Sequence, residues 1–491
     1  MWMVILLLVA LACCTAWWVI TTKDEPQAYP GYLPLIGHAY LLIGDSINLW
    51  NLVKMISYKS LKAEGAVSLW IGPRRLYFVA DPNDFLKIAN TCFQKDEIYE
   101  YAKPWVGNGL VTSDALLWKA HRKMLNPAFN PAVLDGFIEM FNSQARRLVK
   151  SLEVEAGRGP FDHWAYSRIN ALETICFGAL GIDFRNKNDL FNEYANATEE
   201  LFSIVLKRFQ TIWLHSDFMY NRSELKKRQD KLLTFVHNMS NGILKKKKAD
   251  LLNCDNVEDK KKGKEAIFKP FLDLILELSR EQGTFNDEEI REHVDTIILA
   301  GYDTSAIVVT YVLMLVGSYP HIQKKVCEEL HEVFGDEDRD VTKQDLSKLV
   351  YIDAVFKETM RFYPAAPVVA RHLDKDIKLR NCTLSKGKTC ILSVYGVHRH
   401  AVWGLDAEEF KPERWLDPAT LPDVPNAFAG FSMGRRNCIG QAYAGMSIRI
   451  ILSHIFRNYK VYGDHTKMVA RFDILLKPVS GYHVQIEKRN K

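Results

Sequence analysis

FSMGRRNCIG, the stretch from Phe431 to Gly440, places one cysteine between two glycines and close behind a pair of arginines. The residues that follow, 439–459, are apolar on several faces and therefore predict a buried helix. Cys438 would lie at the N-terminus of that helix, where backbone amides and the nearby arginines stabilise a negatively charged sulfur. Gly434 and Gly440 permit a tight turn and let a flat ligand approach the backbone.

Several kinds of site could use this cysteine. A zinc site would need further ligands at ordered spacing, and the nine cysteines of the chain form no C-x-x-C pair. A nucleophilic cysteine would need a nearby histidine, which the sequence does not place. A thiolate ligand to an iron porphyrin needs only this one residue. The remaining alternative is a small buried hydrophobe without chemistry.

The stretch resembles the haem-binding signature of the cytochromes P-450, F-x-x-G-x-R-x-C-x-G. All five positions of that signature are filled, by Phe431, Gly434, Arg436, Cys438 and Gly440. The resemblance implies that Cys438 is the proximal thiolate ligand of a haem iron and that Arg436 binds a haem propionate. Phe431 would then pack beside the sulfur, where a neighbour can tune the iron.

A long helix is predicted within residues 284–320. Asn286 and Glu289 form an N-cap with a capping-box partner, and the apolar pattern continues to about Gly317. Gly301 lies in the middle and costs ~1 kcal/mol relative to alanine. From these residues alone the helix is either a flexed core helix or the wall of a small pocket that handles protons.

AGYDTS, from Ala300 to Ser305, resembles the oxygen-binding groove pattern [AG]-G-x-[DE]-T of the same family. The resemblance implies that Asp303 and Thr304 deliver protons for oxygen activation, and that Ala300 and Gly301 leave space above the haem. Thr304 can also bond back to the Ala300 carbonyl and bend the helix. Many family-4 members carry glutamate before the groove glycine and esterify the haem through it. With Ala300 there, we expect haem b without a covalent link.

Further motifs agree with this family. Glu358 and Arg361 are three residues apart on one helix face, a spacing that otherwise suggests a surface ion pair. They match the E-x-x-R pattern, and KPERW resembles the P-E-R-F segment, so the resemblance implies a structural triad of Glu358, Arg361 and Arg414.

Three more residues would reach the haem propionates. WKAHR matches W-x-x-x-R, which assigns this role to Trp118 and Arg122, and Arg371 occupies a position where the family often has another partner. An arginine fork binds a carboxylate at two points. Without the resemblance, both arginines would be read as ordinary surface residues.

The sequence predicts one large, mainly helical body with small β-sheets, as in the cytochrome P-450 fold. Short strands are expected at 66–71, 76–79 and near 389–394, with more at the C-terminus. Residues 245–269 are low in complexity and lysine-rich, which predicts a solvated loop. Residues 211–220 are rich in large apolar groups and are expected to be core, with contact to a bilayer surface as the alternative.

The N-terminus predicts a membrane anchor. Residues 1–20 contain no charge, and at ~1.5 Å per residue they span about the ~30 Å hydrocarbon core of a bilayer. A cleaved secretory signal is the alternative, but the basic start of such a signal is missing. We expect an anchor over 1–22, a proline-rich hinge over 23–40 and a haem-thiolate catalytic domain over 41–491.

The resemblance is closest to the family-4 clan, in particular its insect-like microsomal members, and it covers nearly the whole chain. It implies a monooxygenase that inserts one atom of dioxygen into a small apolar substrate. Electrons would come from NADPH through cytochrome P-450 reductase, with a b-type cytochrome as a further partner. The domain would face the cytosol from the endoplasmic reticulum membrane. A net charge of +5 gives no case for nucleic acid.

Two alternative functions remain open. One is a haem-thiolate isomerase or dehydratase that uses no reductase, against which the intact Asp303–Thr304 pair argues. The other is a noncatalytic haem or lipid binder, against which the completeness of the motif set argues.

Overall fold

The computed structural model describes residues 24–181, 188–255, 270–424 and 426–489, so the predicted anchor over 1–22 lies outside the described residues. Helices make up most of this structure, which confirms the predicted fold class. The α-helices are α2 (Ser46–Lys62), α3 (Pro82–Thr91), α4 (Lys103–Val106), α5 (Ala115–Leu125), α6 (Pro131–Asp135), α7 (Ile138–Leu152), α8 (His163–Leu180), α9 (Asn188–Gln210), α10 (Asp217–Tyr220), α11 (Glu224–Asp255), α12 (Phe271–Gln282), α13 (Asp287–Ser318), α14 (Pro320–Phe334), α15 (Lys343–Lys348), α16 (Val350–Phe362), α17 (Val394–Val397) and α18 (Gln441–Asn458).

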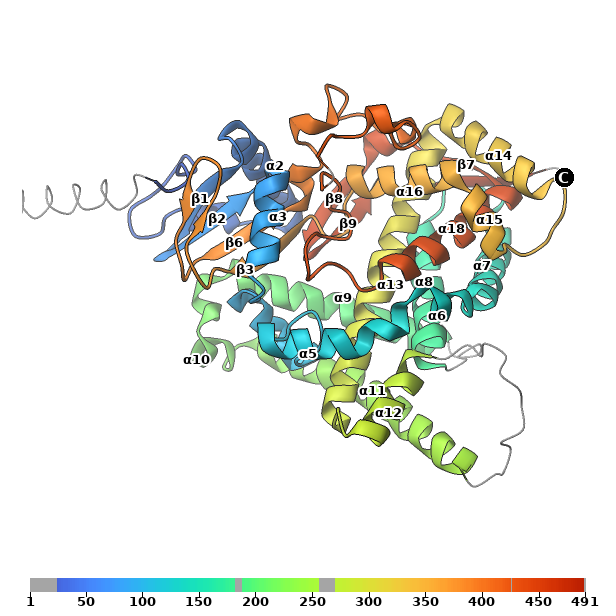
Figure 1. Ribbon diagram of the computed structural model, residues 1–491, viewed down its shortest axis with the longest axis horizontal. Helices are drawn as coiled ribbons and strands as arrows, with labels where there is room; N and C mark the ends of the chain where they lie inside the picture. The colour runs from blue at the N-terminus through green and yellow to red at the C-terminus, as the bar shows by residue number, and fades with distance from the viewer. Residues whose placement is uncertain (1–23, 182–187, 256–269, 425, 490–491) are drawn as a thin grey trace, which may run out of the picture.

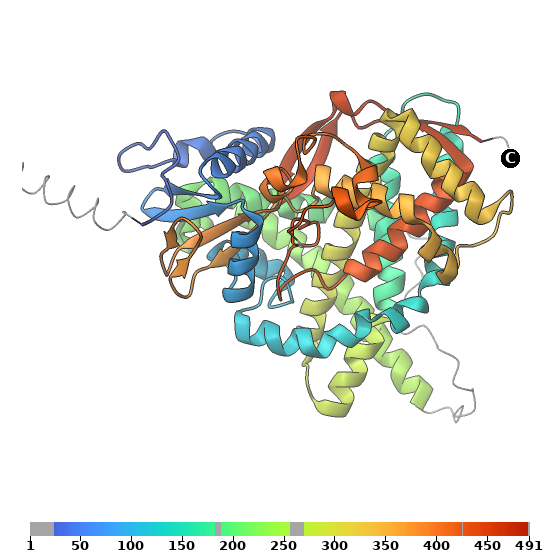
Figure 2. The same cartoon turned by 45° about the horizontal axis from the view of Figure 1, so that its top comes forward.

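Small sheets accompany the helices. The strands are β1 (Ala66–Ile71), β2 (Arg74–Val79), β3 (Val368–His372), β4 (Ile377–Lys378), β5 (Thr383–Leu384), β6 (Thr389–Ser393), β7 (Tyr459–Tyr462), β8 (Val469–Asp473), β9 (Leu475–Ser480) and β10 (Gln485–Lys488). The largest sheet has the order β1-β2-β6-β3, in which β2 and β6 are parallel and the other pairs antiparallel. It lies at the N-terminal side of the molecule, away from most of the helices, in both Figure 1 and Figure 2.

Helix α13 runs through the middle of the helical part and packs along α8 (Figure 1). The predicted capping box is present, because Asn286 and Glu289 exchange side chain to backbone hydrogen bonds. The helix ends at Ser318, just before Pro320. It is the one helix in the described part of the chain that is long and apolar enough to cross a membrane, but 78% of its apolar window is buried. It is therefore a core helix.

A second, smaller hydrophobic cluster lies between the large sheet, α3 and the loop before α18. Phe85 and Ile88 of α3 are fully buried in it, and Ala429 and Met433 join it from the loop. The apolar residues of α3 and those of the loop are buried against each other, so this cluster fixes the Cys438 segment against α3.

Two sequence predictions about surface segments were wrong in part. Residues 245–255 continue α11 as helix where a loop was predicted, and 256–269 lie outside the described residues. Residues 211–220 form a 3₁₀ turn over Ile212–His215 followed by α10, with the Trp213 and Phe218 side chains 67% and 62% exposed. The core interpretation holds only for Leu214 and Tyr220, which face inward.

Candidate active site

The Cys438 loop is held by its backbone. Gly434 has a φ of +74°, and a Cβ there would come within 3.0 Å of the backbone of Ala89 in α3, so glycine is required on both counts. The Cys438 amide donates a hydrogen bond of 2.9 Å to the Phe431 carbonyl and closes the loop. Gly440 then caps the N-terminus of α18.

The Cys438 thiol lies deep in the protein but is exposed to an internal cavity that it helps to line. Burial raises the pKa of this thiol, while the Gly440 amide and the Arg122 guanidinium oppose that rise. Of the two arginines in the loop, Arg436 donates to carbonyls and Arg435 is exposed, so the arginine close to the sulfur is Arg122 of α5. A metal ion bound at the sulfur would add the positive charge that favours a thiolate.

The cavity has a volume of about 320 Å³ and joins residues that are distant in the sequence. Cys438 and Phe431 line it from the loop, and Ala300, Gly301 and Thr304 line it from α13. The remaining wall is mostly apolar, with these side chains among its lining: Leu110, Val111, Ile297, Val308, Ala365, Ala366 and Val369. The cysteine loop and the α13 groove predicted from the sequence thus meet at one cavity.

Cationic side chains gather at one end of the cavity. Arg122 donates to the carbonyl and side chain oxygens of Asn437, at 2.7 and 3.2 Å, which ties α5 to the Cys438 loop. Arg436 donates to the carbonyls of Phe93 and Ser113, and its guanidinium lies 4.9 Å from the centre of the Trp118 ring. Burial lowers the pKa of Arg436 to about 9, and the positive charge of Arg371 is the second cause of this shift.

Arg371 and Lys95 complete this group of cations. Arg371 is buried, and although it is not among the lining residues, it lies close enough to Lys95 and Arg436 to lower the pKa of both. Lys95 lines the cavity, and burial followed by Arg371 and Arg436 lowers its pKa well below the usual value. No motif pointed to Lys95, because its neighbours in space come from other segments of the chain.

These cations have no carboxylate partner among the described residues. The ion pairs found there include none to Lys95, Arg122, Arg371 or Arg436, and the Arg371 Nε has no hydrogen-bond acceptor. Arg371 and Arg436 are buried, and buried positive charges are normally paired. They fit a ligand with carboxylates at one edge, and the apolar walls fit a flat macrocycle between them. The part of the chain that is described holds no cluster of three metal-ligating side chains, so a single thiolate donor also fits.

Two residues of the α13 groove, Gly301 and Asp303, make contacts that the sequence did not predict. The Thr304 hydroxyl donates to the Ala300 carbonyl at 2.6 Å, as expected, and both residues line the cavity. A Cβ on Gly301, however, would lie 2.7 Å from the Ile175 side chain of α8. The glycine therefore also permits α8 and α13 to approach each other. Asp303 is not among the lining residues and instead pairs with Lys477 of β9, at 2.8 Å.

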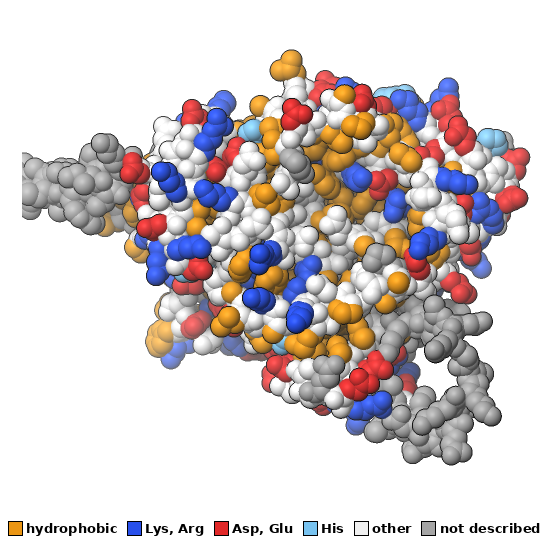
Figure 3. All heavy atoms as spheres, viewed as in Figure 1, with side chains coloured by type: hydrophobic (Ala, Val, Ile, Leu, Met, Phe, Trp, Pro, Cys, Tyr) orange, Lys and Arg blue, Asp and Glu red, His pale blue; other side chains and the backbone are white. Residues whose placement is uncertain are grey.

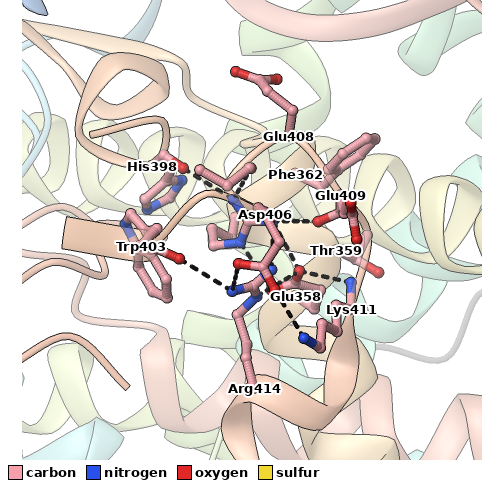
Figure 4. A network of polar contacts seen from close by, with 12 residues as sticks. Glu358, Thr359, Phe362, His398, Trp403, Asp406, Glu408, Glu409, Lys411 and Arg414 are labelled. Atoms are coloured by element: carbon pink, nitrogen blue, oxygen red, sulfur yellow. Dashed lines mark hydrogen bonds and ion pairs between the residues drawn. The ribbon is translucent and has the colours of Figure 1, made fainter. Parts of the chain in front are cut away.

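Glu358, Arg361 and Arg414 meet in a buried network, and Figure 4 shows Glu358 and Arg414 within it. Arg361 donates to both carboxylate oxygens of Glu358 at 2.8 Å, and Arg414 donates to one of them at 3.0 Å. The Trp415 indole and the Lys411 amide add two more hydrogen bonds. Because all three charged side chains are at most 2% exposed, a surface ion pair is excluded.

The Arg361 guanidinium also donates to the carbonyls of His398, Ala407 and Glu409. The network thus fixes the segment that leads from β6 towards the Cys438 loop. None of the three side chains lines the cavity.

The sequence was compared with known families and proteins. The model of the family described as Cytochrome P450 matches residues 28–486. The chain is 32% identical to "Cytochrome P450 4V2" of Homo sapiens over 470 residues, which covers 93% of this chain and 88% of that protein. It is 30% identical to "Cytochrome P450 4g15" of Drosophila melanogaster, with 94% and 91% covered, and 30% identical to "Cytochrome P450 4c3" of the same organism, with 94% and 89% covered.

These relatives carry family-4 names, in agreement with the family-4 resemblance of the motifs. A cysteine loop facing a helical groove, with unpaired cations at the edge of the cavity, fits a thiolate-ligated haem. The chain therefore belongs to the cytochrome P450 family and is a haem-thiolate monooxygenase.

Proposed function

We propose that this protein hydroxylates or otherwise oxygenates a small apolar substrate, using NADPH electrons that arrive through a reductase. The observation that carries the proposal is the single cavity in which the Cys438 thiol and the Thr304 hydroxyl face a shared, mainly apolar space. The polar lining is concentrated at the cationic end, so little is left on the other walls to bind a charged substrate.

Haem b, when bound, supplies the reductive activation of dioxygen. Cys438 is the residue that would ligate its iron, and Arg122, Arg371, Arg436 and Lys95 would hold its propionates. Ala300 has no carboxyl group with which to form an ester, so we propose that the haem is not covalently attached. Trp118 would pack against Arg436 and keep its fork in place.

The proton-handling residue that lines the cavity is Thr304. Its hydroxyl is held by the Ala300 carbonyl and can accept a proton from one neighbour while it donates to another. Asp303 directly precedes Thr304 on α13 and is proposed to supply protons to Thr304 and to water in the cavity.

A basic surface near the Cys438 loop supports a reductase partner. Lys119 and Lys123 of α5 and Arg435 of the loop are exposed. Figure 3 shows lysine and arginine side chains on this face, over the region of α3 and α5. Such a surface would attract an acidic electron donor at the side of the protein closest to the iron ligand. A b-type cytochrome could use the same charges.

An exposed apolar surface supports membrane attachment. Leu35 and Ile43 are 93% and 79% exposed near the start of the described chain, and Trp213 and Phe218 are exposed between α9 and α11. The two parts are joined, because the Gln210 side chain donates to the Leu42 carbonyl at 3.3 Å. An anchor over 1–22 would bring this surface to the bilayer, which we propose is that of the endoplasmic reticulum.

Cytosolic orientation has a direct test. The asparagines of four N-x-S/T sites are exposed, namely Asn196, Asn221, Asn238 and Asn381. We expect all four to be free of glycans in microsomes. A mass shift on treatment with an endoglycosidase would reverse the proposed topology.

The function itself is tested with the purified full chain, a reductase and a panel of fatty acids, fatty alcohols, terpenes and plant aromatics. We expect an NADPH-dependent product that contains one atom of labelled dioxygen. A product formed without reductase would instead indicate an isomerase or dehydratase, and spectral binding without any product across the panel would indicate a noncatalytic binder.

A further inference from the structure

The segment between α4 and α5, residues 107–113, packs closely against α13. Gly107 has a φ of +53°, and a Cβ there would overlap the carboxyl group of Glu292. The φ of Gly109 is not positive, but a Cβ there would overlap the hydroxyl of Thr296. Both glycines therefore let the backbone of this segment approach α13 more closely than a larger residue would allow.

Glu292 of α13 binds the backbone of this segment. Its carboxyl group accepts a hydrogen bond from the Asn108 amide, which opposes the rise in the pKa of Glu292 that burial causes. The neighbouring Arg291 pairs with Asp295 at 3.0 Å, and Glu292 has no ion pair of its own in the described part of the chain. A buried carboxyl group needs hydrogen bonds to offset the loss of water. The Asn108 amide supplies one, so the contact ties the segment to α13.

Residues 107–113 form a compact unit. The Thr112 hydroxyl donates to the Gly107 carbonyl at 2.7 Å and closes the segment on itself. At the other end, Arg436 donates to the carbonyls of Leu110 and Ser113, at 3.3 and 2.9 Å. The unit is thus held at both ends, by α13 and by the loop that carries the cysteine.

The middle of this unit forms part of the cavity wall. Leu110 and Val111 line the cavity, and Thr296 and Ile297 line it from α13. Leu110 is 9% exposed and Val111 is 41% exposed, so Val111 presents more free surface to this space. Glu292 does not line the cavity, so it acts on this wall from behind.

We propose that Glu292 is a positioning residue for substrate selectivity: its hold on the Asn108 amide keeps Val111 in place at the cavity, and Val111 limits the width of the substrate that fits. This rests on the proposed function, in which an apolar substrate occupies this cavity. A side chain that is held in place excludes a broad molecule by contact, whereas a wall that can yield does not. Selectivity then depends on a residue that the substrate does not touch.

The test uses two alcohols with the same number of carbon atoms, the straight-chain decanol and the cage-shaped adamantanol. The full-length holoenzyme is titrated with each alcohol, and the dissociation constant is read from the shift of the haem absorption band. KM and kcat are measured separately with NADPH and reductase. The variants are Glu292→Leu, Glu292→Gln, which keeps an acceptor for the Asn108 amide, Val111→Ala, and Glu292→Leu combined with Val111→Ala.

Hydrogen exchange of residues 107–113, measured by mass spectrometry, reports on the segment independently of turnover. The matched control is Glu329→Leu. The carboxyl group of Glu329 also accepts hydrogen bonds from backbone amides, those of Tyr351 and Ile352 at 2.5 and 3.0 Å, but it ties α14 to α16 and does not line the cavity. Haem content and the thermal midpoint are measured for every variant, so that loss of structure is recognised.

We expect faster exchange at 107–113 in Glu292→Leu. The ratio of the dissociation constants, adamantanol over decanol, should fall by about tenfold, as for a small change in an apolar pocket, and the KM values should follow while kcat changes little. Val111→Ala should shift the ratio in the same direction. The double variant should differ little from Glu292→Leu, because Val111 excludes the broad alcohol only while the segment is held. Glu292→Gln should keep most of the wild-type ratio, and Glu329→Leu should keep both the ratio and the exchange at 107–113.

An unchanged ratio or unchanged exchange in Glu292→Leu would overturn the inference. So would weaker binding of both alcohols by the same factor together with a loss of haem, which would mark a structural role. If Glu292→Leu does not fold, Val111→Ala decides, and an unchanged ratio in that variant overturns the inference.

The outcome for the proposed function is separate. A wild type that binds neither alcohol would overturn the inference, because the width of the substrate would then not decide entry. The proposed function fails only if no compound of the wider panel gives product with NADPH and reductase.

Discussion

Replacement of Glu358 by glutamine removes the negative charge at the centre of the buried network while the side chain keeps its shape. The Glu358 carboxylate accepts hydrogen bonds from Arg361, Arg414, the Trp415 indole and the Lys411 amide. After the change, Arg361 remains buried without a counter-charge, while Arg414 keeps only its pair with Asp406 at 3.1 Å. Leaving a buried ion unpaired costs about 3–5 kcal/mol, so we expect a loss of this size in the free energy of unfolding.

The matched control is Glu413→Gln. Glu413 pairs with Lys325 at 2.6 Å, but these side chains are 31% and 47% exposed, and an exposed pair contributes about 0–1 kcal/mol. Unfolding of both holoproteins in urea is followed by tryptophan fluorescence and by the haem absorption band, and the midpoints are compared at equal slope. Equal stability losses for Glu358→Gln and Glu413→Gln would refute the reasoning that the buried network holds the fold.

Three further predictions follow from the structure. Gly301→Ala should destabilise the protein by about 1–3 kcal/mol, because its Cβ would overlap the Ile175 side chain, and Ile175→Ala in the same chain should recover much of the loss in thermal midpoint. Arg371→Met and Lys95→Met should each weaken haem retention, measured as the rate of haem transfer to apomyoglobin, whereas an exposed Lys119→Met control should not. Burial raises the pKa of Glu358, but Arg361 and Arg414 outweigh burial and hold that pKa below the usual 4.5. The stabilisation from the ionised Glu358 is therefore complete above pH 4.5 and should be lost as the pH falls further. Acid unfolding of the wild type and of Glu358→Gln will check this, because the variant should lack this pH dependence.

Local patterns in the sequence were sufficient to predict structural features that lie within one helix or one loop. The capping box of Asn286 and Glu289, the Thr304 hydrogen bond and the tight turn at Gly434 each depend on neighbours within a few residues. The family resemblance was also confirmed over nearly the whole chain. Such features can be predicted because helix caps and turns have fixed spacing.

Contacts between distant segments could not be predicted in this way. Lys95 meets Arg371 and Arg436 only because three separate segments converge, and Lys477 meets Asp303 across 174 residues of sequence. The role of Gly301 against Ile175 is likewise a property of helix packing, which no pattern within one helix reveals.

The predictions for the two surface segments, 211–220 and 245–255, were wrong for a related reason. Large apolar residues such as Trp213 and Phe218 predict burial by composition, yet only Leu214 and Tyr220 of 211–220 are buried. The lysine-rich residues 245–255 predict a loop by composition, yet they extend a helix that begins at Glu224.

The central claim is that Cys438 is the thiolate ligand of a haem held between the loop and α13. The carbon monoxide difference spectrum of the reduced protein tests it directly, because a thiolate ligand shifts the main absorption band to longer wavelength than an imidazole or hydroxyl ligand does. We predict the thiolate band for the wild type and for Cys327→Ser, a partly exposed cysteine elsewhere, and its loss in Cys438→Ser. A Cys438→Ser protein that keeps the thiolate band would contradict the account.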